Sequence, residues 1–432
     1  MKIGITAYCC DPNRGTEFGL GWGWANAYAL RGHEVTVVTS RDAISREGRA
    51  TASLRGELPP GLTFIELADE VVDSISSPDG LAAMIDFHHS YQAWIRAASH
   101  YMADHAFDIA HHVSGGSVQG GSPLREANAG AVVFGPVGGG QHAPWRSIPH
   151  LGGSGGSEIV RSLLWAPAIG RRLKLSRSFE NIDLALATNS DTARLMTNLG
   201  VGDVTVMLAD GVDGDAIGRP TTRTGARRSG PLRLVWVGRL APRKGVRTML
   251  RAASELHRRQ FPFTLDIIGD GVMMDKVRRT VREDGLNSCV RVRGQVPHEQ
   301  VVTDLDRADA HLFTSWRDSF GAQCLEAWAR GVPTIFLDLH GVRDFAPLAG
   351  GVRVAPFPAG SAHVRLANAV ERFADEGGGP SNRDQLAMNF AFRERWTAKV
   401  ERVEIALFGP SVHQIDRVRP EPLMPEPLQI AN

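Results

Sequence analysis

The chain has 432 residues, of which 43% are hydrophobic and 22% are charged, the proportions of a folded globular protein. This length exceeds one ordinary hydrophobic core and favours two domains, or three. Lys and Arg (48) nearly balance Asp and Glu (47), so net charge gives no general affinity for polyanions, and we expect no nucleic acid among the partners.

Cysteine usage and the first residues indicate the compartment. Cys9, Cys10, Cys289 and Cys324 have neither metal-ligand spacing nor a disulfide framework, which favours a reducing environment. The first residues, MKIGITAY, alternate like a strand and lack the apolar core of a signal peptide. No run of about 18 apolar residues is present, so we expect no membrane-spanning segment and a cytoplasmic protein.

The predicted elements begin with a strand at 2–7, a turn at 11–15, a helix at 16–30 and a strand at 34–39. Helical or glycine-rich stretches separate four further β-rich segments, at 107–110, 131–134, 183–187 and 203–207. Short apolar strands that alternate with helices favour a doubly wound parallel sheet. We therefore expect residues 1–212 to form a Rossmann-like domain.

A linker and a second alternation follow. Residues 213–231 (DGDAIGRPTTRTGARRSGP) are rich in Gly, Pro, Thr and Arg without an apolar period, which is typical of a linker. Strands are then predicted at 232–237, 264–268, 290–293, 310–314, 334–337 and 352–355, with helices at 246–259, 272–282, 299–307, 321–330 and 362–374. Residues 232–382 are the second predicted domain, 383–408 a closing helical stretch, and the proline-rich 409–432 a disordered tail.

Open parallel sheets bind ligands outside the carboxyl ends of their strands, so the cleft between two such domains is the expected site. Arg239 and Lys244 follow the strand at 232–237, on the loop VGRLAPRKG. They suit a diphosphate, because Arg offers a bidentate fork and Lys a mobile point charge. The alternative is that both are solvated loop charges, as Arg243 and Arg247 are expected to be.

The stretch RDSFGAQCLE (317–326) places Asp318 and Glu326 on either side of a helix start expected near Phe320 or Gly321. Free N–H groups and the positive end of the helix dipole suit a phosphate or an electron-rich sugar. Glu326 could accept hydrogen bonds from both hydroxyls of a ribose, and Asp318 lies closer to the incoming group. Alternatively, Asp318 caps the helix and Glu326 is an exposed helix charge.

Three further candidate site segments follow predicted strands of the first domain. The turn at 14–19 contains Gly15, where the backbone could approach a ligand, but it is not the G-x-G-x-x-G of nicotinamide enzymes. His111 and His112, expected just after the strand at 107–110, could carry protons or hold a hydroxyl, or they could be structural. The glycine-dense run FGPVGGGQH (134–142) is expected to line the acceptor side.

Together these motifs resemble the retaining glycosyltransferases of family 4 over about residues 1–408. Members of that family carry a motif of the form E-G-F-G-x-x-x-x-E-A-x-A-x-G-x-P, and the matching run here is DSFGAQCLEAWARGVP (318–333), with Asp318 in place of the first Glu. The run DGVD (210–213) is similar to the family's Asn-Gly-Val-Asp segment. The fold that the resemblance implies is α/β of the GT-B type, two Rossmann-like doubly wound parallel-sheet domains facing each other across a cleft.

The resemblance also implies roles for single residues. Arg239 and Lys244 would bind the donor's diphosphate, and Glu326 its ribose. The remaining implied positions are backbone amides at the donor sugar and phosphate (Ser319, Phe320, Gly321), the N-terminal glycine loop (Gly15), and groups at the reacting sugar (Asp318, and either His111 or His112). The helical stretch 383–408 would cross back onto the first domain.

The implied activity is retaining transfer of a hexose from a nucleotide diphosphate sugar to a saccharide or polyprenyl-linked acceptor, in surface polysaccharide or glycolipid biosynthesis. No cofactor is implied, and no metal is required where Arg239, Lys244 and a helix dipole stabilise the leaving diphosphate. The alternatives are a non-catalytic nucleotide-sugar-binding relative and a GT-B epimerase. Residues 161–177, with Leu, Trp and five cations, suit docking on an anionic membrane surface as a peripheral protein, or packing as a partly exposed helix.

Overall fold

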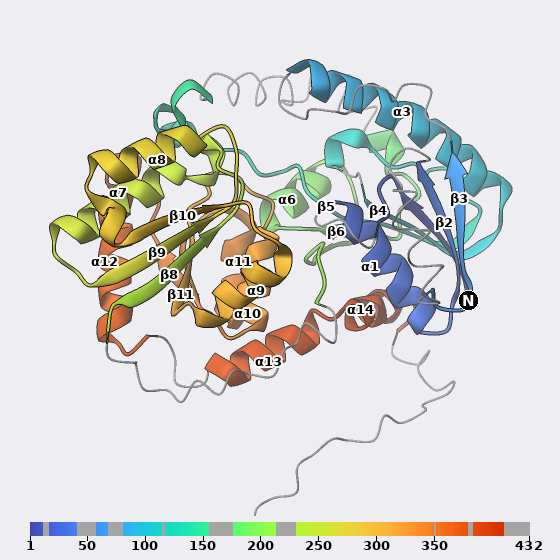
Figure 1. Cartoon of the computed structure of the whole chain (residues 1–432). Coiled ribbons are helices and arrows are strands. Elements are labelled where there is room, and N and C mark those ends of the chain that lie inside the picture. The colour runs from blue at the N-terminus through green and yellow to red at the C-terminus, as the bar shows by residue number, and fades with distance from the viewer. Residues whose placement is uncertain are drawn as a thin grey trace, which may run out of the picture.

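The computed structural model describes residues 1–11, 17–40, 58–67, 81–114, 117–154, 176–212, 230–349, 351–378 and 383–409. Within them, two parallel β-sheets form two domains that lie side by side, with helices on their faces (Figure 1). This confirms the predicted fold class. Gly15, most of the linker and tail, and residues 161–175 lie outside the described part of the chain.

The first domain is built on a seven-stranded sheet of order β3-β2-β1-β4-β5-β6-β7. Its strands are β1 (Lys2–Ala7), β2 (Glu34–Ser40), β3 (Leu62–Leu67), β4 (Phe107–Ser114), β5 (Ala129–Val137), β6 (Leu184–Ala187) and β7 (Val204–Val206). Its helical segments are α1 (Glu17–Leu30), α3 (Leu81–Asp104), η1 (Val118–Gly120), η2 (Trp145–Ser154) and α6 (Ser190–Asn198). The order reverses between β1 and β4, which places a switch point at their carboxyl ends.

The second domain has a six-stranded sheet of order β10-β9-β8-β11-β12-β13. Its strands are β8 (Leu232–Val237), β9 (Phe263–Ile268), β10 (Val290–Gly294), β11 (Ala310–Phe313), β12 (Thr334–Leu337) and β13 (Val352–Val354). Its helical segments are η3 (Pro242–Lys244), α7 (Val246–Arg258), α8 (Met274–Glu283), η4 (Leu286–Ser288), α9 (His298–Arg307), α10 (Ala322–Ala329), α11 (His340–Ala349), η5 (Ala359–Ser361) and α12 (Ala362–Asp375). Its switch point lies between β8 and β11.

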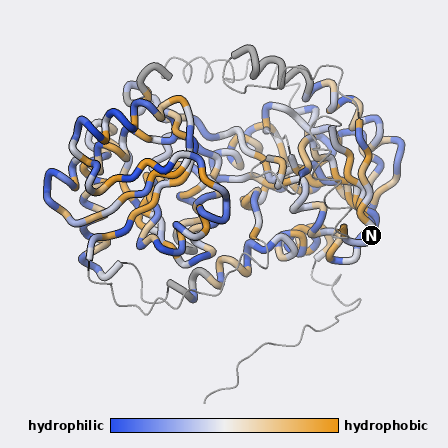
Figure 2. Tube along the Cα trace, viewed as in Figure 1, coloured by the Kyte–Doolittle hydropathy of each residue, from blue (hydrophilic) through white to orange (hydrophobic). Residues whose placement is uncertain are grey.

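Burial explains why these segments form strands and helices. Five of the six residues of β1 are buried, as expected for a central strand covered on both faces. Along α7 the buried positions include Val246, Met249, Leu250 and Ala253, which is the 3.6-residue period of a helix with one apolar face. Figure 2 shows the same division, with orange concentrated along the strands inside each domain and blue on the outer helices.

The closing helical stretch is two helices, α13 (Arg383–Arg393) and α14 (Trp396–Phe408), where one was expected. Figure 1 shows them running from the second domain to the first, with α14 beside α1. Between them, Arg395 is extended and pairs with Val212, whose N–H donates to the carbonyl of Glu394 at 2.8 Å. The chain passes between the domains twice, once after Val212 and once between α13 and α14. These two crossings are therefore hydrogen-bonded to each other.

Candidate active site

A cavity of about 470 Å³ lies between the two domains, at the carboxyl ends of the strands. The first domain contributes glycines and polar side chains at the exits of β4, β5 and β6, with Asp210: Ser117, Gln119, Gly138, Gly139, Gln141, His142, Thr188 and Asp210. The second domain contributes the exits of β8 and β11: Arg239, Arg243, Lys244, Asp318, Ser319, Phe320, Gly321, Ala322 and Gln323. The switch points of both sheets thus open into one space.

Three cations line the side of the cavity that the second domain forms. Arg239 follows the end of β8, and Arg243 and Lys244 belong to the short helix η3. The turn after η3 closes at Gly245, which has φ +71° and lies so close to the carbonyl of Thr314 that a Cβ atom would clash with it. The loop after β8 is thereby pressed against the loop after β11. Arg243 was expected to be an ordinary surface charge, and its place in the lining corrects that expectation.

Lys244 and Asp318 form an ion pair inside the cavity. The Lys244 ammonium donates to Oδ2 of Asp318, and both side chains are less than 15% exposed. The hydroxyl of Ser315 donates to the same oxygen at 3.2 Å. Burial opposes ionisation of Asp318, but Lys244 and Arg243, together with the two hydrogen bonds, lower its pKa on balance. Asp318 is therefore a carboxylate at neutral pH, held by the cation that was expected to bind phosphate.

The helix start predicted near Phe320 or Gly321 is that of α10, which follows Gly321 at φ +102°. Ser319, Phe320 and Gly321 all line the cavity, so the first free backbone N–H groups of the helix lie beside the three cations. Glu326, one turn further along α10, is partly buried and is not part of this lining. Burial raises the pKa of Glu326, although His298 and Arg330 oppose the rise.

His111 and His112 do not lie at a strand exit, because β4 runs four residues beyond its expected end at residue 110. His111 is fully buried, with Nδ1 3.1 Å from the Tyr28 hydroxyl and Nε2 2.6 Å from the carbonyl of Gly135. His112 is equally buried, 2.9 Å from Thr6 Oγ1 and 3.1 Å from the Tyr91 hydroxyl. Neither lines the cavity.

Burial lowers the pKa of His111 to about 4 and that of His112 to about 3, so both rings are neutral at physiological pH. All four ring nitrogens have partners inside the first domain. The expectation that one of these two histidines faces the reacting sugar is therefore at odds with their position. They are core residues whose hydrogen bonds tie β4 to α1, β1, α3 and β5.

The glycine-dense run at 134–142, which was expected on the acceptor side, does reach the cavity. Gln141 accepts a hydrogen bond from the Gly139 N–H at 2.9 Å, and His142 lies beside it in the lining. Neither side chain was singled out from the sequence, although the glycine-dense run around them was. Among the described residues, no group of three or more His, Cys, Asp or Glu side chains is placed to hold a metal ion.

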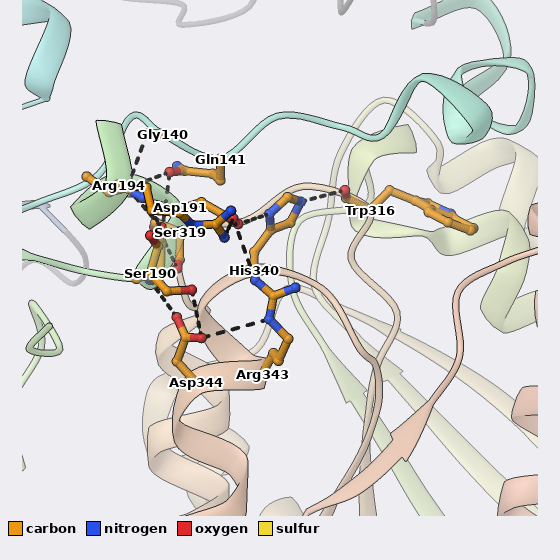
Figure 3. A network of polar contacts seen from close by, with 12 residues as sticks. Gly140, Gln141, Ser190, Asp191, Arg194, Trp316, Ser319, His340, Arg343 and Asp344 are labelled. Carbon is orange, nitrogen blue, oxygen red and sulfur yellow. Dashed lines mark hydrogen bonds and ion pairs between the residues drawn. The ribbon is translucent and has the colours of Figure 1, made fainter. Parts of the chain in front are cut away.

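A polar network joins the two domains beside the cavity (Figure 3). At the start of α6, the Ser190 N–H and hydroxyl donate to the Asp344 carboxylate at 2.7 and 3.0 Å. Asn189, the N-cap of α6, donates to the carbonyl of Ser319 at 2.8 Å. His340 lies 3.0 Å from Asp191. The start of α6 in the first domain therefore contacts both α11 and the loop that carries Asp318.

Comparison with known proteins is most specific for the second domain. Residues 231–376 match the family model described as "Glycosyl transferases group 1". A glycogen synthase of Mycobacterium tuberculosis is 28% identical over 221 residues, which cover 47% of this chain and 51% of that protein. An alpha-D-kanosaminyltransferase of Streptomyces kanamyceticus is 29% identical over 37% of this chain and 39% of that protein. The chain thus spans about half, or less, of the length of the curated relatives it matches.

Solved structures agree over nearly the whole chain. Sucrose-phosphate synthase from Thermosynechococcus elongatus has a TM-score of 0.64 at 17% identity, covering 94% of this chain and 99% of that one. The galactosyltransferase WaaB of the lipopolysaccharide outer core has a TM-score of 0.59 at 16% identity, over 94% and 99%. Anabaena HepE, solved in complex with UDP and glucose, has a TM-score of 0.57 at 12% identity, over 93% and 99%.

These likenesses to solved structures concern the fold, whereas the family model concerns the second domain alone. The chain has the GT-B fold, and its second domain, at residues 231–376, matches the group 1 glycosyltransferases.

Proposed function

We propose that the protein transfers a sugar from a nucleotide diphosphate sugar to a hydroxyl of a saccharide or lipid-linked acceptor, with retention of the anomeric configuration. The observation that carries this proposal is the meeting of three cations with the start of α10 in one interdomain cavity. A diphosphate is the group that such a set of donors fits best. The bound UDP and glucose described for HepE agree with a nucleotide-sugar ligand.

The rate increase would come mainly from stabilising the leaving diphosphate. Negative charge develops on the phosphate oxygens as the glycosidic bond breaks, and Arg239, Arg243 and the free N–H groups of α10 are fixed beside that position. The Lys244 ammonium has three N–H donors, so it can keep one on Asp318 and turn others to the diphosphate. A front-face departure, with the acceptor entering from the same side, would retain the configuration without a metal ion.

The acceptor would enter from the first domain, where Gln141 and His142 offer hydrogen-bonding groups. A lipid-linked acceptor would place the enzyme at an anionic membrane surface, which the basic residues 161–177 suit. Within the described part of the chain, no helix is long and apolar enough to cross a bilayer. A role in surface polysaccharide or glycolipid synthesis, on the cytoplasmic side of the membrane, fits these features.

Thermal unfolding with UDP, GDP and ADP tests the donor site. A nucleotide at about a hundred times its dissociation constant should stabilise the protein by roughly 2.7 kcal/mol. We expect Lys244→Ala to weaken that binding by about 1.5–3 kcal/mol, since it removes a charge-assisted hydrogen bond. Arg247→Ala is the matched control, because Arg247 lies on the neighbouring turn but outside the cavity lining. Equal effects of the two substitutions would contradict the assignment of Lys244.

Product analysis separates the three activities that a nucleotide-sugar site allows. Acceptor-dependent product whose anomeric proton matches the donor's configuration supports retaining transfer. Turnover of the donor without any acceptor would indicate an epimerase or hydrolase. Binding without turnover, across a panel of saccharide acceptors, would indicate a non-catalytic relative.

A further inference from the structure

His340, the first residue of α11, has an unusual backbone conformation. Its φ is +53°, in the left-handed region that disfavours residues with a Cβ atom, and its side chain is only 8% exposed. Such strain costs on the order of 1–3 kcal/mol and persists only where surrounding contacts hold it. The contacts of the imidazole ring are therefore expected to hold this backbone conformation.

Both ring nitrogens of His340 face acceptors (Figure 3). Nδ1 lies 3.0 Å from Oδ2 of Asp191, and Nε2 lies 3.2 Å from the backbone carbonyl of Trp316. A carboxylate and a carbonyl oxygen can only accept, so each bond requires an N–H on the ring. A neutral imidazole has one N–H and the imidazolium has two. Only the doubly protonated ring would satisfy both acceptors at once.

The two partners belong to different parts of the site. Asp191 lies on α6 of the first domain, whereas Trp316 lies on the loop after β11, two residues before Asp318. Trp316 is otherwise held inside the second domain: its N–H donates to the Arg243 carbonyl at 2.8 Å, and its indole N–H to Thr248 at 3.2 Å. In this arrangement His340 connects the Trp316 carbonyl to the first domain.

We infer that His340 is a positioning residue whose imidazolium couples closure of the two domains to the placement of the loop at 315–321, which presents Asp318 and Ser319 to the cavity. The inference rests on the proposed function, since that loop would hold the donor. Losing one ring proton would leave a lone pair facing Asp191 or Trp316, so either the interdomain bond or the loop contact would be lost. Closure is then weaker when the ring is neutral.

Other charged groups at this junction keep Asp191 ionised. Arg194 of α6 and Arg343 of α11 also reach Oδ1 of Asp191, at 2.7 and 3.6 Å, and Arg343 lies 3.8 Å from Asp344. The hydrogen bond from His340 is the main cause of the lowered pKa of Asp191, and the cations add to it against burial. Asp191 therefore stays ionised below the usual range of an aspartate, and it remains a charged acceptor for the His340 ring.

Two measurements on the full chain test this without any transfer assay. In protein labelled with ¹³C-histidine, the resonance that disappears in His340→Asn reports the ring's charge. We expect the imidazolium form in the closed protein at about pH 6 and the neutral form in the expanded protein at about pH 8.5. Small-angle scattering should show a larger radius of gyration at about pH 8.5 than at about pH 6.

His340→Asn is the informative variant, because Asn tolerates the left-handed backbone. In most geometries its side-chain amide can donate to only one of the two acceptors. We expect it to be as expanded at pH 6 as the native protein is at pH 8.5, with UDP bound roughly 5- to 30-fold more weakly. Asp191→Asn should also lose the pH dependence of the radius of gyration. His363→Asn, a histidine outside this junction, is the matched control and should keep it.

A neutral His340 resonance at pH 6, or a native pH dependence in His340→Asn, would overturn the inference. Absence of UDP binding by the native chain is a different result: it would remove the proposed donor site, while the resonance and the scattering would still decide the role of His340.

Discussion

Asp318 competes with the donor for Lys244, because its carboxylate neutralises the same ammonium that would bind the donor's diphosphate. Asp318→Asn removes a negative charge from the cavity and releases Lys244 from its ion pair. We expect UDP to bind about tenfold more tightly, since like-charge repulsion with the diphosphate disappears. Turnover should fall by about 10²- to 10³-fold if the carboxylate acts on the reacting sugar, as the resemblance implies. Calorimetry with UDP and initial rates measure the two effects separately.

Asp318→Glu is the control for charge, since it keeps the carboxylate and lengthens the side chain by one methylene. It should leave UDP affinity within about threefold and keep or raise turnover. A gain in UDP affinity equal to that of Asp318→Asn would show that the charge of Asp318 is not what limits nucleotide binding.

Among single residues, sequence patterns predicted the charged groups of the cavity correctly, but they misplaced the two histidines. Arg239, Lys244 and Asp318 follow strand ends that the apolar pattern marks, and all three line the cavity. His111 and His112 were expected at a strand exit because the predicted strand ended at residue 110. Tyr28, Thr6 and Tyr91 supply hydrogen bonds that let both rings remain inside β4, and those partners are distant in sequence.

Among the helices, α1 shows how glycines inside a helix can serve packing. A Cβ atom at Gly23 would clash with the indole of Trp396, the first residue of α14, and a Cβ at Gly211 would clash with the same ring. Trp396 also packs edge-on against Trp24, with ring centroids 6.1 Å apart. Gly23 therefore allows α14 to dock against α1.

Gly23→Ala should therefore destabilise the protein although alanine favours helices. Displacing Trp396 costs about 1–3 kcal/mol as overpacking, of which improved helix propensity offsets up to about 1 kcal/mol. Urea unfolding measures the net loss. Gly202→Ala is the matched control, because a Cβ at Gly202 meets nothing within 4 Å. A stabilised Gly23→Ala protein would show that α14 can shift without cost.

Two element boundaries could not be predicted from local sequence. The run LHGVRDFAP contains a glycine and a proline and no capping side chain, yet α11 begins at His340 because Asp191 and Trp316 hold the ring. The break between α13 and α14 contains neither Gly nor Pro. It exists because the Glu394 carbonyl accepts from Val212 of the other chain crossing instead of continuing the helix. Both are tertiary effects.

For the whole molecule, alternation of strands and helices was sufficient to predict two parallel-sheet domains, because each sheet is buried on both faces and its strands are nearly continuous apolar runs. The relative placement of the domains depends on polar contacts between distant residues, which no local pattern encodes. Ser190 with Asp344 and Asn189 with Ser319 are such contacts.

The two chain crossings between the domains, near residues 208–212 and 394–399, form a hinge that contains a buried charge. Lys399 of α14 is fully buried; its ammonium donates to the Leu208 carbonyl before the linker, and lies 3.2 Å from the Glu394 carboxylate. Burial lowers the pKa of Lys399 to about 8, with Glu394 opposing the shift, so the ammonium is still mostly charged at pH 7. One side chain thus joins both chain crossings.

Lys399→Met should destabilise the protein by about 3–5 kcal/mol in urea unfolding at pH 7, because Glu394 keeps its charge in a buried site after losing its closest cation. Adding Glu394→Gln should recover much of the loss, since it removes a buried carboxylate that would have only the partly exposed Arg393 and Arg402 as cations. Arg402→Met is the control: Arg402 also reaches Glu394, at 3.3 Å, but is 30% exposed and should cost under about 1 kcal/mol. A double variant as unstable as Lys399→Met alone would show that the bond to Leu208, rather than charge balance, holds the hinge.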